Sequence, residues 1–573
     1  MTAGVKVARR RRGTMAGVVG AALLVGSLVL DSGGAYAQPS PGPTPTGRSD
    51  ARPDGKPGDQ GGAGHDGKGG DGHDGRRDDG HNGDGHGGGT SADPSRSTPA
   101  APKPTASTSS VPAAPTGSPF ASPQASARPA PPAAGLVLRA ADDDGAATPT
   151  TQGLRQALAA ALQDQSLGTV TFAVADAASG HLLYGSGENT PGTPASTTKL
   201  ATALATLSLV PSDTRIATRV VKGAAPGEIT LVGGGDPTLT ALPADQVQLG
   251  GMPADADTAP ASLQALAAKT AVALKQAGTT TVSLGYDTSL YVGSTQHKNY
   301  DAANIAMVTP LMADEGRVDP KSREDAPARV ADPADQAAGQ FAVLLKAQGI
   351  TVEGKPKQVT PATATGAPAT ATTGAATPGA TPPAAVLAQV ESPTVARLVE
   401  RMLTTSDNTL AEALARQAAL AAHRPASFEG AATAVTTALT GLGVQLTGVV
   451  LNDGSGLHTG NAIPPAVLVQ LLALAAAPNH PELRPVLTGL PIAGFTGTLG
   501  KRFAAGSGSA EAAGIVRAKT GTLSGVNTLA GTVVDADGRL LAFAVMTRTT
   551  AAADTARAAM DRIAARLGAC GCH

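Results

Sequence analysis

The spacing of apolar residues predicts that the folded part of the chain begins near residue 150 with a helix and a β-hairpin. Leu154, Leu158 and Leu162 recur every four residues, which predicts a helix with one apolar stripe. The segments "TVTFAVAD" (169–176) and "GHLLYGSG" (180–187) follow as strands joined by a short Ala-Ser-Gly turn.

The C-terminal end carries the same kinds of element in the opposite order. "NTLAGTVV" and "RLLAFAVMT" flank "DADG", which predicts an antiparallel hairpin with a glycine-containing loop. A closing amphipathic helix is indicated by Met560, Ile563, Ala564 and Leu567. We therefore expect the two ends to build one antiparallel sheet covered by helices, an α+β fold rather than a series of βαβ units.

The middle of the chain interrupts this pattern. Residues 220–358 have strand-like segments and a helix-like run of their own, and residues 359–385 are rich in Ala, Thr, Pro and Gly, as in a flexible surface loop. The helix-like run consists of Leu263, Leu266, Ala267, Val272 and Leu274. We predict one domain made of residues 150–219 and 386–568, split by inserted material at 220–358 and by the loop.

Residues 1–37 have the pattern of an export signal. Four arginines precede an apolar stretch (15–30), and "AYA" (35–37) fits a cleavage site. The uncharged residues 13–30 lie at the lower edge of the length that spans a bilayer, so a retained anchor that tethers the protein to the membrane stays open. We expect an exported protein that acts outside the cytoplasm, either secreted or associated with the cell wall or membrane.

Composition and net charge indicate which part of the chain does not fold and which ligands the protein does not bind. Residues 38–149 are a Pro/Gly/His/Asp-rich linker that cannot bury enough apolar surface to fold, so we expect it to be disordered. The formal net charge of −1 provides no field that would attract nucleic acid. Both cysteines lie in the tail (569–573), which we also expect to be disordered. Neither this tail nor the linker histidines fix a ligand geometry, and we predict no metal and no cofactor.

Three short motifs appear in one order along the chain. "STTK" (196–199) begins a predicted helix, "SDN" (406–408) precedes another, and "KTGT" (519–522) lies at the end of a predicted edge strand. Taken alone, each has a plain structural explanation as a helix start, a helix cap or a turn. Their joint occurrence is far less frequent by chance and indicates one shared site.

The residue types of the motifs suit nucleophilic catalysis. Ser196 is a weak nucleophile without an adjacent base. Lys199 lies one helical turn later on the same face and can act as that base if burial and the nearby Lys519 lower its pKa. Ser406 can relay a proton to a leaving amine, and Asn408 can hold both the substrate amide and Lys199.

The third motif suits a substrate that ends in a carboxylate. Lys519 offers a cation, Thr520 and Thr522 offer two hydroxyls, and Gly521 allows a substrate backbone to approach closely. The backbone N–H groups of Ser196 and Thr522 would form an oxyanion hole.

The three motifs and several longer blocks resemble the D-alanyl-D-alanine carboxypeptidase/endopeptidase family. These are low-molecular-mass penicillin-binding proteins with a large insertion between the first two motifs. The resemblance covers about residues 150–568. The longer blocks are "GGGDPTLT" (233–240), "YDTSLY" (286–291), "MADEGR" (312–317), "LNDGSGL" (451–457), "GFTGTLGKRF" (494–503) and "VRAKTGTLSGVNTLAG" (516–531).

The resemblance implies a penicillin-binding, serine β-lactamase-like fold: an antiparallel sheet flanked by helices, a helical subdomain and one or more inserted domains. It implies hydrolysis of peptidoglycan, both of stem peptides that end in D-Ala-D-Ala and of crosslinks, through an acyl-serine, with β-lactams as covalent inhibitors. It suggests Asp287 at the mouth of the cleft, in contact with the peptide stem; a turn residue before a strand is the equal alternative. His458 departs from the family pattern, where a small polar residue is more usual.

Two other functions are weighed against this one. A β-lactamase of class A needs a carboxylate-activated water on an extra loop, and no Glu-x-x-x-Asn segment lies between "SDN" and "KTG". A non-catalytic wall-binding protein would not need all of the motif residues, which are intact. The balance between carboxypeptidase and endopeptidase activity stays open at this point.

Overall fold

The computed structural model describes residues 146–573 apart from 250–251, 323, 325 and 360–383. The predicted export signal (1–37), nearly all of the predicted linker (38–149) and nearly all of the predicted loop (359–385) lie outside these residues. Among the residues that the structure does describe, no helix is both long enough and apolar enough to cross a bilayer.

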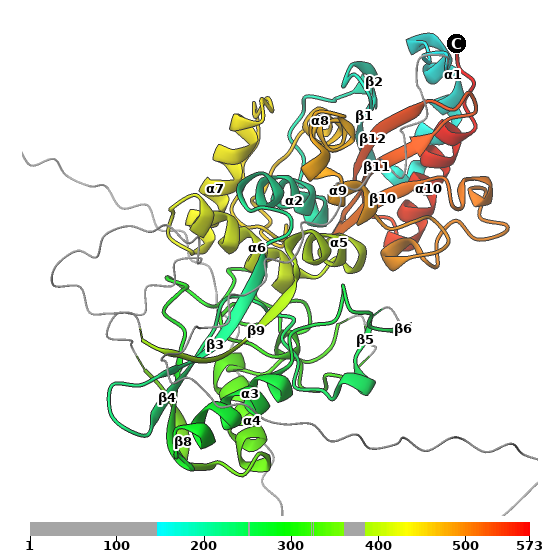
Figure 1. The fold of residues 1–573 in the computed structure, drawn as a ribbon. Helices are drawn as coiled ribbons and strands as arrows, with labels where there is room; N and C mark the ends of the chain where they lie inside the picture. The colour runs from blue at the N-terminus through cyan, green and yellow to red at the C-terminus, as the bar shows by residue number, and fades with distance from the viewer. Residues whose placement is uncertain (1–145, 250–251, 323, 325, 360–383) are drawn as a thin grey trace, which may run out of the picture. The chain divides into compact units, whose positions relative to one another are not determined.

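The first sheet is antiparallel and joins the two ends of the folded region, as predicted (Figure 1). Its order is β10-β11-β12-β1-β2, so that β10 is an edge strand. The bounds are β1 (Thr169–Asp176), β2 (Leu182–Ser186), β10 (Arg517–Leu523), β11 (Val526–Val534) and β12 (Leu540–Arg548). The chain termini of this region meet because β1 pairs with β12 along its whole length.

Alternating side chains of this sheet face two different helical layers. The large residues Phe172 and Phe543 pack with α1 (Thr151–Leu162) and α10 (Ala553–Gly568). The small residues Ala173 and Ala544 pack on the other face, against α2 (Thr198–Leu209) and α8 (Pro465–Ala476). Small side chains on this face let α2, and the motif at its N-terminus, lie close to the sheet.

A helical subdomain completes the fold around α2. Ten of the twelve residues of α2 are buried, which makes it the central helix of this layer. Its neighbours are α5 (Val395–Thr405), α6 (Asn408–Ala421), α7 (Phe428–Gly441) and α9 (Pro485–Thr488). The predicted α+β fold with a helical subdomain is confirmed.

The inserted segment forms a second, mixed sheet of order β8-β7-β4-β3-β9, covered by α3 (Leu263–Gln276) and α4 (Pro333–Ala347). The pairs β4–β7 and β7–β8 are parallel, and the others are antiparallel. A separate two-stranded ribbon joins β5 (Gln248–Leu249) and β6 (Met252–Pro253). The bounds of the sheet are β3 (Arg215–Lys222), β4 (Glu228–Val232), β7 (Thr281–Asp287), β8 (Thr351–Gln358) and β9 (Val386–Thr394).

Three expectations differ from the structure. Because β3 pairs with β9, the second sheet extends from 215 to 394, and the predicted boundaries at 220 and 386 cut through it. Val272 does not belong to the apolar stripe of α3, since its side chain is 56% exposed. The tail is ordered rather than disordered: Cys570 and Cys572 form a disulfide, and Cys572 O accepts a hydrogen bond from Thr150 N at 2.7 Å.

Candidate active site

The first motif lies where a short 3₁₀ turn, η3 (Ala195–Thr197), enters α2. Ala195 has a φ of 47°, a left-handed conformation that is strained for a residue with a side chain. Lys199 follows one turn after Ser196 and is fully buried. Its Nζ donates to Ser196 Oγ at 3.1 Å, Asn408 Oδ1 at 2.6 Å and Ser455 O at 2.7 Å. The structure therefore brings the first two motifs together around one amino group.

The second motif is the junction between α5 and α6. Ser406 ends α5 in a left-handed conformation with a φ of 59°. Asp407 caps α6 by accepting a hydrogen bond from Leu410 N at 2.7 Å, and Asn408 is the first residue of that helix. The sharp turn sends Ser406 Oγ to Lys519 Nζ, 2.8 Å away, while Asn408 reaches Lys199.

The third motif lies within the edge strand β10. Side chains alternate along a strand, so Lys519 and Gly521 share one face and Thr520 and Thr522 share the other. Thr520 Oγ1 donates to Thr498 Oγ1 at 2.8 Å, and Thr522 Oγ1 accepts from Arg557 Nη2 at 3.2 Å. The two hydroxyls thus face away from Lys519, and their binding of a substrate carboxylate stays a prediction.

Burial dominates the electrostatics of both lysines. It lowers the pKa of Lys199 to about 8, against the opposing effect of the carboxylates of Asp453, Asp407 and Glu412. Burial also lowers the pKa of Lys519 well below its usual value, and repulsion from Lys199 adds to that shift. Burial thus lowers the pKa of Lys199, as expected. The repulsion between the two cations, however, lowers the pKa of Lys519 rather than that of Lys199.

Gly521 permits the close approach of β10 to the turn that carries Ser196. A Cβ atom at this position would overlap Thr528 Oγ1 and would lie 2.8 Å from Pro194 O and 3.0 Å from Ser196 N. We expect Gly521→Ala to push the strand and the turn apart, which lowers the acylation rate by penicillin about 10–100-fold and stability by about 1–3 kcal/mol. Stopped-flow labelling and thermal unfolding measure the two effects.

The matched control for that variant is Gly339→Ala in α4, where an added Cβ meets nothing within 4 Å. We expect it to leave acylation unchanged and to raise stability by about 0.5–1 kcal/mol, because alanine is the better helix former. Wild-type acylation in Gly521→Ala would show that the contact between strand and turn does not position Ser196.

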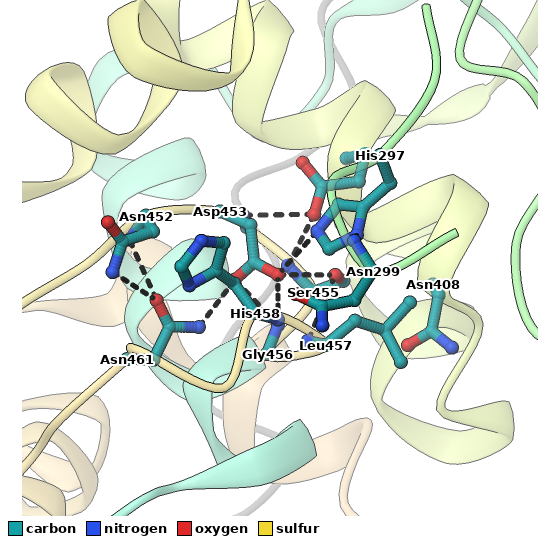
Figure 2. Close-up of polar contacts among 12 residues, drawn as sticks. His297, Asn299, Asn408, Asn452, Asp453, Ser455, Gly456, Leu457, His458 and Asn461 are labelled. Atoms are coloured by element: carbon teal, nitrogen blue, oxygen red, sulfur yellow. Dashed lines mark hydrogen bonds and ion pairs between the residues drawn. The ribbon is translucent and has the colours of Figure 1, made fainter. Parts of the chain in front are cut away.

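The loop "LNDGSGL" (451–457), whose Asp453 and Ser455 are seen in Figure 2, contacts Lys199 through the Ser455 carbonyl oxygen. Asp453 and Ser455 in "LNDGSGL" are buried, and the backbone N–H groups of Gly454 and Ser455 donate to Glu412 Oε1 at 3.1 and 2.8 Å. Glu412 lies one turn into α6 and also forms an ion pair with Arg416, and both of these residues are buried. The signal that could have found Asp453 is an acidic residue inside a glycine-rich block that two leucines flank.

A turn of the inserted segment contacts the second motif. Glu315 is buried in η5 (Asp314–Gly316) with a φ of 57° and forms an ion pair with Arg401 of α5. When Asp407, the N-cap residue of α6, is protonated, its carboxyl group donates a hydrogen bond to Glu315. Burial and the Glu315 charge raise the pKa of Asp407 to about 6. Glu315 therefore pairs with the end of α5 and lies beside the start of α6, on both sides of Ser406, a position that sequence analysis missed.

Asp287 is the last residue of β7, and its side chain is 3% exposed. Its carboxylate accepts a hydrogen bond from Ser289 N at 2.7 Å, which starts a turn. It is thus a turn residue after a strand rather than before one, and it leaves little surface for a substrate. Contact with the peptide stem stays a prediction.

One group of side chains has the composition of a metal site. Ligand atoms of His297, Glu412 and Asp453 lie within 4.8 Å of one another, and all three residues are buried. The Asp453 carboxylate, however, already accepts hydrogen bonds from five groups. His297 Nδ1 accepts from Asn299 N at 3.0 Å, so Nε2 carries the ring proton and donates it to Asp453. His297 and Asp453 are thus engaged in hydrogen bonds within the protein, whereas Glu412 Oε2 has no hydrogen-bond partner and pairs with Arg416 Nη1 at 3.5 Å, so we assign no cation to this group.

Comparison with known proteins agrees with this geometry. The model of the D-Ala-D-Ala carboxypeptidase 3 (S13) family matches residues 154–328 and 320–567. A carboxypeptidase of Mycobacterium tuberculosis is 36% identical over 456 residues, which cover 78% of this chain and 89% of the relative.

Solved structures of penicillin-binding protein 4 (dacB) from Haemophilus influenzae share the fold. One has a TM-score of 0.53 at 21% identity and covers 72% of this chain and 97% of that one. A second, complexed with a β-lactam, has a TM-score of 0.51 at 22% identity and covers 71% and 97%. The match of the family model and the identity to the mycobacterial relative confirm the predicted resemblance: the chain belongs to the D-Ala-D-Ala carboxypeptidase 3 (S13) family.

Proposed function

We propose that this protein is a penicillin-binding serine peptidase that removes the terminal D-Ala from peptidoglycan stem peptides through an acyl-serine at Ser196. The observation that carries the proposal is the placement of Lys199. Its buried Nζ contacts both Ser196 Oγ and Asn408 Oδ1, and its pKa is lowered to about 8. Membership of the family supports the class of reaction and of substrate.

Acylation begins when neutral Lys199 takes the hydroxyl proton of Ser196. With a pKa of about 8, roughly a tenth of the molecules hold this amine neutral at pH 7, enough for a general base. Ser196 Oγ attacks the carbonyl carbon between the two D-Ala residues, and the C–N bond of the peptide breaks. The proton returns to the departing amine through Ser406, which contacts Lys519. Water then hydrolyses the ester and regenerates Ser196.

Substrate binding is assigned to the edge strand. The backbone N–H groups of Ser196 and Thr522 would bind the developing oxyanion. In its protonated form Lys519 would attract the terminal carboxylate, with Thr520 and Thr522 at the rim of β10 and Arg557 beside Thr522. Asn408 would hold the substrate amide, and Asp287 would meet the stem from the second sheet. These assignments rest on the motifs and on the positions of these residues in the structure.

Purified, crosslinked muropeptides test the function directly. We expect mass spectrometry of the products to show pentapeptides shortened by one alanine. Release of monomers from dimers would show endopeptidase activity by the same serine, which the family resemblance implies. Unchanged pentapeptides and dimers, after incubation with protein whose fold is verified by circular dichroism, would contradict the proposal.

The lifetime of the penicillin adduct separates this function from that of a β-lactamase. We expect an adduct that persists for minutes or longer, because the segment between "SDN" and "KTG" contains no Glu-x-x-x-Asn sequence of the kind that activates a deacylating water. An adduct that disappears in seconds, with turnover of penicillin, would favour the β-lactamase.

We also propose that the protein acts outside the cytoplasm, where its substrate lies, with the N-terminal segment as export signal and as membrane tether if it is retained. Sequencing the N-terminus of the exported protein decides between the two: cleavage leaves Gln38 first, and retention leaves residues 1–37 in place.

A further inference from the structure

His297 lies in the inserted segment, in the stretch after β7, and its side chain is 2% exposed. The ring packs edge-on against Phe428 at the start of α7, with centroids 5.2 Å apart. Nearby, the Asn304 carbonyl accepts a hydrogen bond from Asn408 Nδ2 at 3.0 Å. This part of the insertion therefore contacts the catalytic domain next to the second motif.

The imidazole has one partner on each nitrogen, and the two partners differ in kind. Nδ1 accepts from the Asn299 backbone N–H within its own loop. Nε2 donates across to Asp453 Oδ2 at 2.9 Å, a contact between residues 156 positions apart (Figure 2). Only the second bond leaves the inserted segment.

Asp453 is the centre of the loop that holds Lys199. Its carboxylate accepts from Ser455 Oγ at 3.1 Å, Gly456 N at 2.9 Å and His458 N at 2.7 Å, so it sets the path of the backbone from 453 to 458. Ser455 O, on that path, accepts from Lys199 Nζ at 2.7 Å. Burial alone would raise the pKa of Asp453, but hydrogen bonds, led by that from His297, lower it to about 2.

We propose that His297 is a positioning residue for acylation: by donating to Asp453, it orients the loop whose Ser455 carbonyl oxygen holds Lys199 against Ser196. The inserted segment thereby takes part in the placement of the general base. This inference rests on the acyl-serine function proposed above and adds a residue that touches neither substrate nor nucleophile.

A matched pair of variants separates the two bonds of the imidazole. In His297→Gln the amide nitrogen reaches the place of Nε2 and keeps the donor to Asp453. In His297→Asn the shorter side chain keeps an acceptor for Asn299 N but no longer reaches Asp453, so the hydrogen bond to Asp453 is lost. We expect His297→Asn to acylate about tenfold more slowly with fluorescent penicillin and His297→Gln to stay within about twofold of wild type.

A double-mutant cycle with Asp453→Asn tests the route of the effect. If His297 acts through Asp453, adding His297→Asn to Asp453→Asn slows acylation by no more than about twofold further. The control is His458→Ser, since the His458 ring lies 6.4 Å from that of His297 and its Nδ1 accepts a hydrogen bond from Gly460 N. We expect it to acylate at the wild-type rate.

Three results would overturn the inference: a wild-type rate in His297→Asn, a slower rate in His297→Gln than in His297→Asn, or full additivity in the double variant. Circular dichroism and thermal unfolding of every variant show that a slow rate does not come from unfolded protein. Failure of the wild-type protein itself to acylate would instead contradict the proposed function, on which the inference depends.

Discussion

Replacement of Ser196 by alanine is expected to abolish acylation by penicillin and to leave the protein folded. Removal of the nucleophile from a serine hydrolase lowers the rate of the chemical step about 10⁶-fold. The fold does not depend on this hydroxyl, because Lys199 keeps its contacts with Asn408 Oδ1 and Ser455 O. Gel fluorescence with a labelled penicillin measures the acylation, and thermal unfolding measures the fold.

The control for this variant is Ser208→Ala, at an exposed serine near the end of the same helix, whose hydroxyl donates a hydrogen bond to Ala205 O. We expect it to label at the wild-type rate. Stoichiometric labelling of Ser196→Ala would mean that the nucleophile is another residue, and the roles assigned to Lys199 and Asn408 would fall with it.

Replacement of Lys199 by methionine is expected to have the second largest effect. Methionine has similar length but cannot take the proton of Ser196, so we expect acylation to slow about 10³–10⁴-fold. Across pH, the wild-type acylation rate should rise to a plateau above the Lys199 pKa of about 8, because only the neutral amine acts as a base. A wild-type rate that is independent of pH from 6 to 9 would contradict this role.

The same variant changes how stability depends on pH. The pKa of Lys199 is about 8 in the folded protein and about 10.5 when the chain is unfolded, so the unfolded state binds more protons between these values. The free energy of unfolding of the wild type therefore gains about 2–3 kcal/mol from this group as pH rises from 7.5 to 10. Lys199→Met lacks the gain, and denaturant titrations of both proteins at the two pH values measure the difference.

The elements and the three motifs could be predicted from the sequence because their signals are local. The apolar stripe of α1 contains Leu154 and Leu158, and β1 and β12 each show an alternation of larger apolar residues with small or polar ones. Each of these patterns lies within one short segment, so the sequence of that segment is enough to predict the element. Ser196 and Lys199 lie on one helical turn, so their contact follows from helix geometry alone.

Other features depend on contacts between distant segments, and no local pattern reports them. His297 meets Asp453 across 156 positions, and Glu315 meets Arg401 across 86. The boundary of the insertion was misplaced for the same reason: Arg215–Lys222 reads as a strand of either sheet until its partner, Val386–Thr394, is known. Composition likewise says nothing of the backbone contact from Thr150 to Cys572 that orders the tail.

The most direct test of the central claim is the location of the covalent adduct. The wild-type protein is incubated with penicillin, digested with trypsin and examined by tandem mass spectrometry. We predict one added penicillin per molecule, carried by peptide 156–199 and localised to Ser196. An unmodified peptide 156–199, with the adduct on another residue or absent, would contradict the assignment of Ser196 as the acylated nucleophile.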